Sequence, residues 1–392
     1  MGAGARSGTT GYTDQRSLRV FARRWRFDLC DRSGRGRAVR TRTRRRAERT
    51  HEGGGAVRAI DLHCHFIPPA LVERIRGDGA AHHITVTERD GKQSVDFAGR
   101  DATQAFPGGM LDLEDRLRRM DAGGVDVQVV SSWMDFSAYV LDPEDGAWLA
   151  RAQNELTVEA IAPYSDRFRA LATVPLQAPE LAVDELRYAL EELGMSGVEI
   201  ATSVVDAELD DRSLEPFWSA AEELGCLILI HPYASLGAER LTRYFLSNIV
   251  SNPAEETTAA AHLIYGGVLE RHPGLKICLT HGGGFLPYQI GRQDRGYVAL
   301  PGKTAGSLSR PPSEFLRSFL YDTVVHDPEA LRFLVARVGA ERVVLGSDYP
   351  FPMGDPDPVG MVTSAALGDE ATAAILGGTA AELLGLEGEG DA

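Results

Sequence analysis

The stretch AIDLHCHFIPPAL, residues 59–71, begins as a short apolar run and ends in His63 and His65, just before two prolines. Side chains at positions i and i+2 of a strand face the same side, so the two imidazoles are predicted to project together. Neutral imidazole is the commonest metal ligand in proteins. A buried strand that ends in this pair therefore suggests, without proving, a metal site at its carboxyl end.

Eight such apolar runs occur in the chain, and helix-like patterns lie between them. The runs are AIDLHCH (59–65), VDVQVVSS (125–132), FRALATVPL (168–176), SGVEIAT (196–202), CLILIHP (226–232), LKICLTHG (275–282), FLYDTVV (319–325) and RVVLGSDYP (342–350). They are short and mostly apolar without strict alternation, as buried parallel strands are. The clearest helix patterns are DLEDRLRRMDAGG (112–124), PEDGAWLARAQNELTVEAIAPY (143–164), PELAVDELRYALEELG (179–194) and SLEPFWSAAEELG (213–225).

Eight strands that alternate with helices predict an α/β protein, a (β/α)8 TIM barrel, over residues 57–392. A doubly wound open sheet is the alternative, but no glycine-rich phosphate loop follows the first strand to favour it. An insertion is expected at about 66–112, after the first strand. Within it, HHITVTERDGKQSVDF (82–97) has alternating segments on both sides of Asp90-Gly91, which predicts a β-hairpin over the mouth of the barrel.

The amino-terminal part has a different composition. Residues 1–50 contain 15 arginines, no lysine and four acidic residues, whereas the rest of the chain carries a net charge of −26. We predict that residues 1–56 are a disordered Arg-rich extension, because they lack apolar periodicity. The interpretation that we favour is an extension without a role in function; a nucleic-acid arm, a membrane arm or a transit peptide are alternatives.

The composition also limits the partners and the location. An acidic folded part repels phosphates, so no nucleic-acid partner is expected. No run of about 18 apolar residues exists, so no membrane span is expected. Four cysteines in 392 residues do not form a disulfide framework, which suits a reducing cytoplasm.

Further groups with metal-ligand or proton-transfer chemistry follow the later apolar runs. His231 ends the fifth run, His281 ends the sixth and Asp348 ends the eighth. The carboxyl ends of barrel strands meet at one face, where active sites are built. Three histidines and a carboxylate suit zinc first, then manganese, iron or cobalt. Such an ion would hold a water molecule and lower its pKa towards neutrality, with His281 as the general acid/base.

The site is predicted to hold one divalent ion per subunit. The chain has three lysines, Lys92, Lys276 and Lys303, and none of them ends the fourth run, GVEIAT. A carboxylated lysine that bridges two metals is therefore not expected. The three glycines after His281 would let the backbone pass close to a substrate.

These residues resemble the amidohydrolase superfamily, and most closely its aminocarboxymuconate-semialdehyde decarboxylase branch. The resemblance extends from Ala59 to Leu384. The motifs that carry it are DLHCHFIPP (61–69), MDAGGVDVQVVS (120–131), HGGGFLPYQIGRQD (281–294), RPPSEFLRSFLYDT (310–323) and RVVLGSDYPFPMGD (342–355).

The resemblance implies roles for individual residues. It implies that the metal ligands are His63, His65, His231 and Asp348. It also implies that His281 is the catalytic histidine, with Asp348 beside it in the catalytic set. Arg292 matches an arginine that binds a substrate carboxylate from the neighbouring subunit of a homodimer. One position departs from the family pattern: Gln104 stands where a second substrate-binding arginine is expected, and Arg100 is the nearest arginine.

The function that the sequence favours is metal-dependent, non-oxidative decarboxylation of a small unsaturated or aromatic carboxylic acid. In that reaction His281 would help to deprotonate the metal-bound water and would later return a proton. The alternative is a metal-dependent hydrolase of an amide, a lactone or a carbon–carbon bond, which the same ligands would serve and which Gln104 mildly favours. A catalytically silent binding protein would be expected to have lost ligands, and none is lost.

Overall fold

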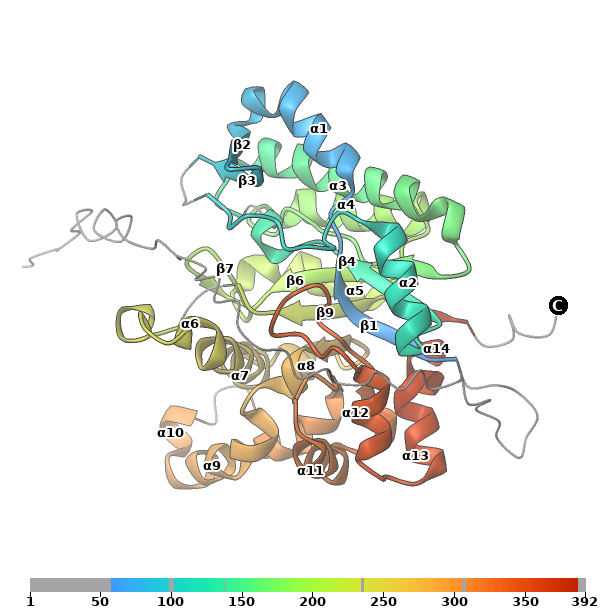
Figure 1. Ribbon diagram of the computed structural model, residues 1–392. Helices are drawn as coiled ribbons and strands as arrows, with labels where there is room; N and C mark the ends of the chain where they lie inside the picture. Colours follow the sequence, from blue (N-terminus) through green and yellow to red (C-terminus); the bar gives the residue numbers. More distant parts are fainter. Residues whose placement is uncertain (1–57, 99–101, 138, 234–235, 305–307, 387–392) are drawn as a thin grey trace, which may run out of the picture. The chain divides into compact units, whose positions relative to one another are not determined.

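The computed structural model describes residues 58–98, 102–137, 139–233, 236–304 and 308–386. The predicted extension, residues 1–56, lies outside these ranges, as does Arg100. Everything below concerns the described residues, which are drawn in colour in Figure 1.

The eight predicted strands are all present, and they form two parallel sheets. One sheet has the order β1 (Ile60–His65), β4 (Val127–Ser131) and β5 (Phe168–Ala170). The other has the order β12 (Val343–Val344), β11 (Phe319–Asp322), β10 (Lys276–Leu279), β9 (Leu227–His231) and β6 (Gly197–Ala201). Single parallel bridges join Cys64 to Tyr349 and Ala172 to Val198. The predicted α/β class with parallel strands is thus confirmed.

The strands are apolar because both of their faces are buried. One face contributes to a cluster that draws side chains from most of the strands, including Leu62, Val129, Leu229, Cys278 and Leu320. The opposite face packs against the helices, for example through Val198, Ile228 and Ile277. This double burial explains why the runs lack the strict alternation of a half-exposed sheet.

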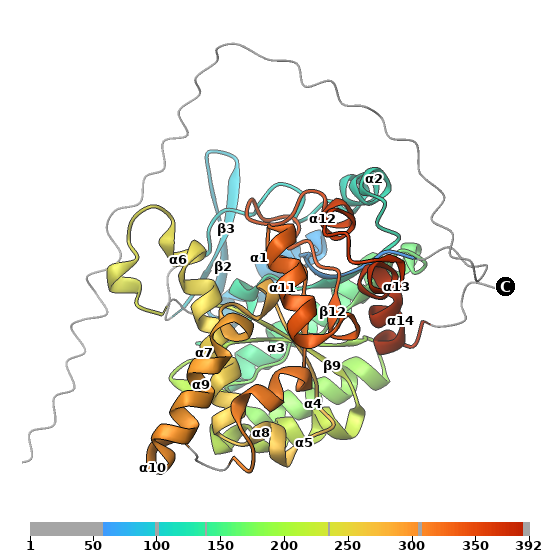
Figure 2. The ribbon, with the colours of Figure 1, turned by 90° about the horizontal axis from the view of Figure 1, so that it is seen from below.

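The predicted helices are present between the strands. They are α2 (Leu113–Gly123), α3 (Pro143–Ile161), α4 (Pro179–Glu191) and α5 (Glu215–Leu224). The carboxylate of Asp112 accepts a hydrogen bond from the Asp115 N–H and caps α2, which ends at Gly124 in the left-handed region. The later helices are α6 (Leu246–Ile249), α7 (Ser251–Tyr265), α8 (Val268–Arg271), α9 (Leu286–Ala299), α10 (Pro301–Thr304), α11 (Pro328–Val338), α12 (Pro358–Ser364), α13 (Asp369–Ala373) and α14 (Thr379–Leu384). Figures 1 and 2 show the longer helices outside the strands.

The predicted hairpin of the insertion is also present. Strands β2 (Ile84–Arg89) and β3 (Lys92–Phe97) pair antiparallel, and Asp90 and Gly91 turn between them with positive φ. A helix that the sequence analysis did not predict, α1 (Pro69–Asp78), precedes the hairpin. Its apolar side chains join Trp133 and Phe136 in a cluster of their own.

No helix in the described ranges is long and apolar enough to cross a membrane. The predicted location in the cytoplasm remains a prediction.

Candidate metal centre and active site

Five side chains from four strands and the turns after them meet at the carboxyl ends of those strands. His63 and His65 end β1, His231 ends β9, and His281 and Asp348 lie just after β10 and β12. The Nε2 atoms of His63 and His65 lie 3.2 Å apart. Both lie close to Asp348 Oδ1, at 3.4 and 3.2 Å respectively. The prediction that the two histidines of β1 project together is confirmed.

The other two histidines face the same point. His63, His231, His281 and Asp348 each offer one ligand atom, and these atoms all lie within 4.8 Å of one another. The ring of His231 lies 4.8 Å from the ring of His65, centroid to centroid. The structure therefore brings together all four predicted metal ligands and the predicted catalytic histidine.

The second nitrogen of each imidazole is held by an oxygen outside the cluster. Nδ1 of His63 lies 2.5 Å from Asp322 Oδ2, and Nδ1 of His65 lies 2.8 Å from the Ser132 carbonyl. Nδ1 of His231 lies 2.8 Å from the Pro232 carbonyl. Such partners hold the proton on Nδ1 and leave the Nε2 lone pair free for an ion. Asp322 on β11 thus orients the His63 ring.

The electrostatics of the cluster suit a cation. Burial and the charges of His65 and His63 lower the pKa of His231 well below its usual range, which favours a neutral ring. Burial opposes ionisation of Asp348, but hydrogen bonds from His281, His63 and His65 outweigh it and hold its pKa well below its usual range. Imidazole nitrogens and an ionised carboxylate form the nitrogen and oxygen donor set that zinc and related divalent ions prefer. The residues present therefore fit a metal ion.

His281 has a carboxylate partner that the sequence analysis missed. Glu256, fully buried on α7, lies 2.8 Å from His281 Nδ1 and also accepts a hydrogen bond from the Thr280 hydroxyl. The Nε2 atom of His281 faces Asp348 Oδ2 at 3.8 Å. Burial alone would lower the pKa of His281, but the charge of Glu256 and hydrogen bonds to Asp348 and Glu256 raise it well above its usual range. This pair can hold a proton beside the cluster.

The chain matches the family model described as amidohydrolase over residues 60–386. It belongs to the amidohydrolase family. A relative named 2-amino-3-carboxymuconate-6-semialdehyde decarboxylase, from Dictyostelium discoideum, is 36% identical over 338 residues, which are 84% of this chain and 92% of the relative. The gamma-resorcylate decarboxylase of Rhodococcus jostii is 29% identical over 259 residues, 62% of this chain and 78% of the relative. Among solved structures, 5-carboxyvanillate decarboxylase from Sphingomonas paucimobilis gives a TM-score of 0.72 at 26% identity, covering 84% of this chain and 99% of that one.

Arg292 is not part of the cluster in this amidohydrolase. It lies on α9 with an exposed side chain. It forms no hydrogen bond or ion pair with any residue in the described part of the chain. Gln104, at the position of the family's second arginine, is also exposed. Within the described chain, the amidohydrolase centre thus has neither residue in contact with it.

Aromatic side chains continue from the cluster of histidines and Asp348 towards the insertion. The Phe351 ring lies 5.1 Å from the His65 ring, and Trp133 lies 5.9 Å from Phe351. Phe106, from the segment after β3, lies 6.1 Å from Trp133. These rings form an aromatic wall, defined here as Phe351, Trp133 and Phe106, against which a planar substrate can stack.

A buried carboxylate lies behind His65. Glu199 on β6 is buried and places Oε1 3.7 Å from His65 Nδ1. Burial raises the pKa of Glu199 to about 7. The run GVEIAT marks the strand, but nothing in it marks the glutamate as a neighbour of the centre.

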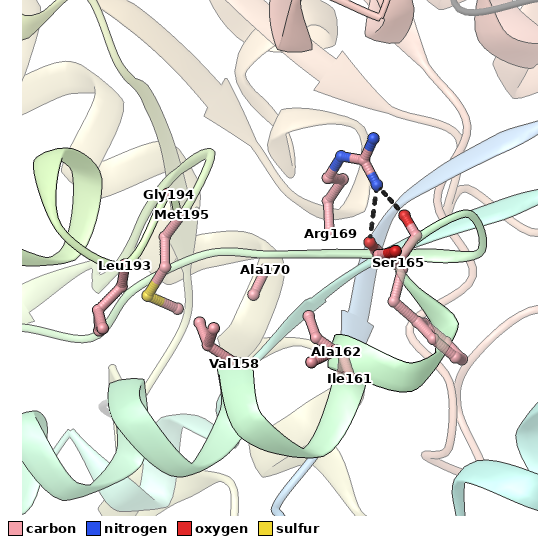
Figure 3. A pocket seen from close by; sticks show the side chains of 10 residues that line it. Val158, Ile161, Ala162, Ser165, Arg169, Ala170, Leu193, Gly194 and Met195 are labelled. Carbon is pink, nitrogen blue, oxygen red and sulfur yellow. Dashed lines mark hydrogen bonds between the residues drawn. The ribbon is translucent and has the colours of Figure 1, made fainter.

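A separate apolar pocket of about 320 Å³ lies far from this chemistry (Figure 3). Its walls include Ile161 at the end of α3, Phe168 at the start of β5 and Met195 just before β6. These positions are at the amino ends of the strands, whereas the metal cluster is at the carboxyl ends. Arg169, at its edge, bonds to the carbonyls of Ser165 and Phe168, and no metal-ligand group lines the pocket. The groups with metal-ligand chemistry thus lie at the cluster and not in this pocket.

Proposed function

We infer that this chain is a metal-dependent, non-oxidative decarboxylase of a small unsaturated or aromatic carboxylic acid. The observation that carries the inference is the convergence of His63, His65, His231 and His281 on Asp348, with each Nδ1 held from outside. The relatives described above are named as decarboxylases of such acids. The aromatic wall beside His65 suits a planar, conjugated substrate.

We propose that His63, His65, His231 and Asp348 hold one divalent ion. When bound, the ion would act as a Lewis acid and as a template for the substrate. Zinc is our first expectation from the donor set, with manganese, iron and cobalt as alternatives. Metal analysis of the purified protein tests this: about one equivalent of a single divalent ion per chain is expected, and a protein without bound metal would contradict it.

His281 is the proposed proton donor. Glu256 fixes the ring so that a proton held at Nε2 points towards the cluster. In the reaction, the bond between the substrate carbon and its carboxylate breaks, and the electron pair stays on that carbon. The proton from His281 then completes the product, so that one proton is consumed for each carbon dioxide released.

The test is carbon dioxide release from a panel of hydroxybenzoates and carboxylated muconate semialdehydes. His281→Ala should lower kcat at least 100-fold, the range attributed to general acid–base groups. His262→Ala is the matched control, because His262 is a half-exposed residue of α7 that pairs with Asp210 at 2.9 Å. Incorporation of labelled water oxygen into the organic product, without carbon dioxide, would point to the hydrolase instead.

We further propose that the enzyme is a homodimer in which Arg292 binds the substrate carboxylate of the neighbouring subunit. Support comes from its exposure, its lack of a partner in the described ranges, and the exposed apolar residues on α9 and before α6. Tyr288 and Val298 on α9 are 74% and 67% exposed, and Tyr244, before α6, is 76% exposed. A second copy of the chain would cover such residues. In Figure 2, α9 runs alongside α7.

Mixed dimers test the role of Arg292. His281→Ala and Arg292→Ala homodimers should both be nearly inactive. If the arginine acts across the interface, a dimer with one subunit of each kind has one complete site, so mixing and exchanging the two variants should restore activity. Without recovery in dimers shown to have exchanged, Arg292 does not act in trans.

We also propose that the eight strands close into one (β/α)8 barrel, and that residues 57–392 form the catalytic domain. The bridges Cys64–Tyr349 and Ala172–Val198 support closure, because they join the two sheets at both of their edges. A variant that begins at residue 57 should retain the kcat of the full chain. A large loss of kcat in a folded truncated protein would assign a role to residues 1–56.

A further inference from the structure

Strand β1 changes the face to which its side chains point. Leu62 lies in the apolar cluster shared by the strands, yet the next residue, His63, points into the metal cluster beside it. Successive residues of a regular strand point to opposite faces. The pairing with β4 explains the change: Asp61 pairs with Gln128 and Cys64 with Val130, so β1 has one extra residue. This β-bulge aims both histidines at the site.

Asp61 fastens the bulge to the segment that carries Asp348. Its carboxylate accepts hydrogen bonds from the N–H groups of His63 at 3.3 Å and Ser347 at 3.0 Å, and from the Ser347 hydroxyl at 2.6 Å. The His63 carbonyl accepts the N–H groups of Ser347 and Asp348 at 3.1 and 2.8 Å. One fully buried carboxylate thus touches the backbone of both segments that present metal ligands.

Two further buried side chains hold Asp61 in place. The Gln128 side-chain N–H donates to Asp61 Oδ2 at 2.8 Å, and its side-chain carbonyl accepts from Arg116 Nη1 at 3.1 Å. Arg116, on α2, also donates to the backbone carbonyl of His65 and lies over the Tyr349 ring at 4.6 Å. These hydrogen bonds therefore run from the backbone of His63 and Ser347 at one end to the backbone of His65 at the other.

The direction of these bonds is fixed by chemistry. Arginine can only donate and an ionised carboxylate can only accept, so Gln128 must point its oxygen at Arg116 and its nitrogen at Asp61. All three side chains are buried, and a wrongly matched donor or acceptor there costs free energy. Only one orientation of the Gln128 amide therefore pairs every donor with an acceptor.

We propose that Asp61, held by Gln128 and Arg116, is a positioning residue that sets the spacing between the histidines of β1 and Asp348 for metal binding. The proposal rests on the metal site of the proposed function. It adds a residue that does not itself touch the ion and that acts through the backbone of the ligands.

Because these hydrogen bonds have a fixed direction, exchanging the acid and the amide between positions 61 and 128 tests the proposal. In Asp61→Asn, the new amide group faces the amide group of Gln128, and turning Gln128 over would set its nitrogen against Arg116. In Gln128→Glu, two carboxylates face each other. In the double variant D61N/Q128E, the new glutamate accepts from both Asn and Arg116, so the chain is satisfied again. We expect about 10- to 100-fold weaker metal binding in each single variant and recovery in the double variant.

The measurement is the dissociation constant of zinc, and separately of manganese, by competition with a chromophoric chelator. The visible spectrum of the cobalt-loaded protein reports whether the ligand geometry changes. Glu185→Gln is the matched control. Its buried carboxylate accepts from Arg151 at 2.8 Å and Asn154 at 2.7 Å between α3 and α4, so the substitution should lower stability but leave the metal affinity unchanged.

The outcomes separate this inference from the proposed function. A folded D61N protein with the wild-type dissociation constant would overturn the inference while leaving the metal site intact. If D61N binds metal weakly and D61N/Q128E does not restore the affinity, the inference is also overturned. The direction of the hydrogen bonds between Arg116, Gln128 and Asp61 would then not be the cause. If D61N does not fold, Q128E and the double variant decide in the same way. A wild-type protein that binds neither ion would overturn the proposed metal site, and this inference with it.

Discussion

The contact with Glu256 determines which nitrogen of His281 faces Asp348 and the other histidines. Its carboxylate takes the Nδ1 side of the ring, as Asp322 does for His63. The sequence analysis placed all four imidazoles of the cluster at strand ends, but the outer partners of His63, His65 and His281 come from other parts of the chain. The sequence marks Asp322 by its position in a strand, whereas Glu256 sits among other polar residues of α7 without any local signal.

Replacing Glu256 with glutamine should separate the effect of its charge on His281 from metal binding. The amide of Glu256→Gln can still accept from Nδ1 but carries no charge to favour the proton on His281, so we expect kcat to fall about 10- to 100-fold with the metal content unchanged. Glu255→Gln is the control, since the neighbouring Glu255 is also buried but accepts from Thr202. Equal kcat values for the two variants would rule out a role for the charge of Glu256.

At the scale of elements, the strands could be predicted because each is a short apolar run. The β-bulge in β1 could not, because it depends on the pairing of Asp61 and Cys64 with β4. Helix α1 was missed because its charged residues interrupt the apolar pattern of Leu71, Val72 and Ile75. The helix is stabilised by burial of these three side chains in the insertion, and not by a clear helical periodicity of its sequence. Tertiary contacts settle what local sequence leaves open.

The glycine-rich turn after β10 is a second case in which packing supplies the reason. The sequence analysis attributed these glycines to close approach of a substrate. In the structure, Gly284 has φ of 61°, and a Cβ atom there would lie 2.0 Å from the Pro253 carbonyl oxygen. The turn therefore fits directly against the start of α7, the helix that also carries Glu256. Close contact with the protein itself already demands glycine.

An alanine pair tests this reading of the turn. Gly225, which caps α5, also has a positive φ, of 60°, but a Cβ atom there would meet nothing within 4 Å. Gly225→Ala should therefore cost about 1–2 kcal/mol of unfolding free energy, the left-handed penalty alone. Gly284→Ala should cost about 3 kcal/mol or more, because steric overlap adds to that penalty. Chemical denaturation measures both, and equal losses would show that the contact with Pro253 can relax.

On the scale of the whole molecule, the metal centre joins parts of the chain that are far apart in sequence. His65 and Asp348, whose side chains lie 3.2 Å apart, are separated by 283 residues. An ion that binds the folded protein and not the unfolded one stabilises it by mass action, by about 2.7 kcal/mol at a free concentration 100 times the dissociation constant.

Removing the ion with a chelator should therefore lower the Tm of the whole domain, and adding zinc back should restore it. In Asp348→Asn this response should be largely lost. Asp210→Asn, which alters a surface pair with His262 at 2.9 Å, should keep it. An equal response in both variants would mean that the stabilising ion binds elsewhere, so the cluster at the strand ends would not be what ties β1 to β12.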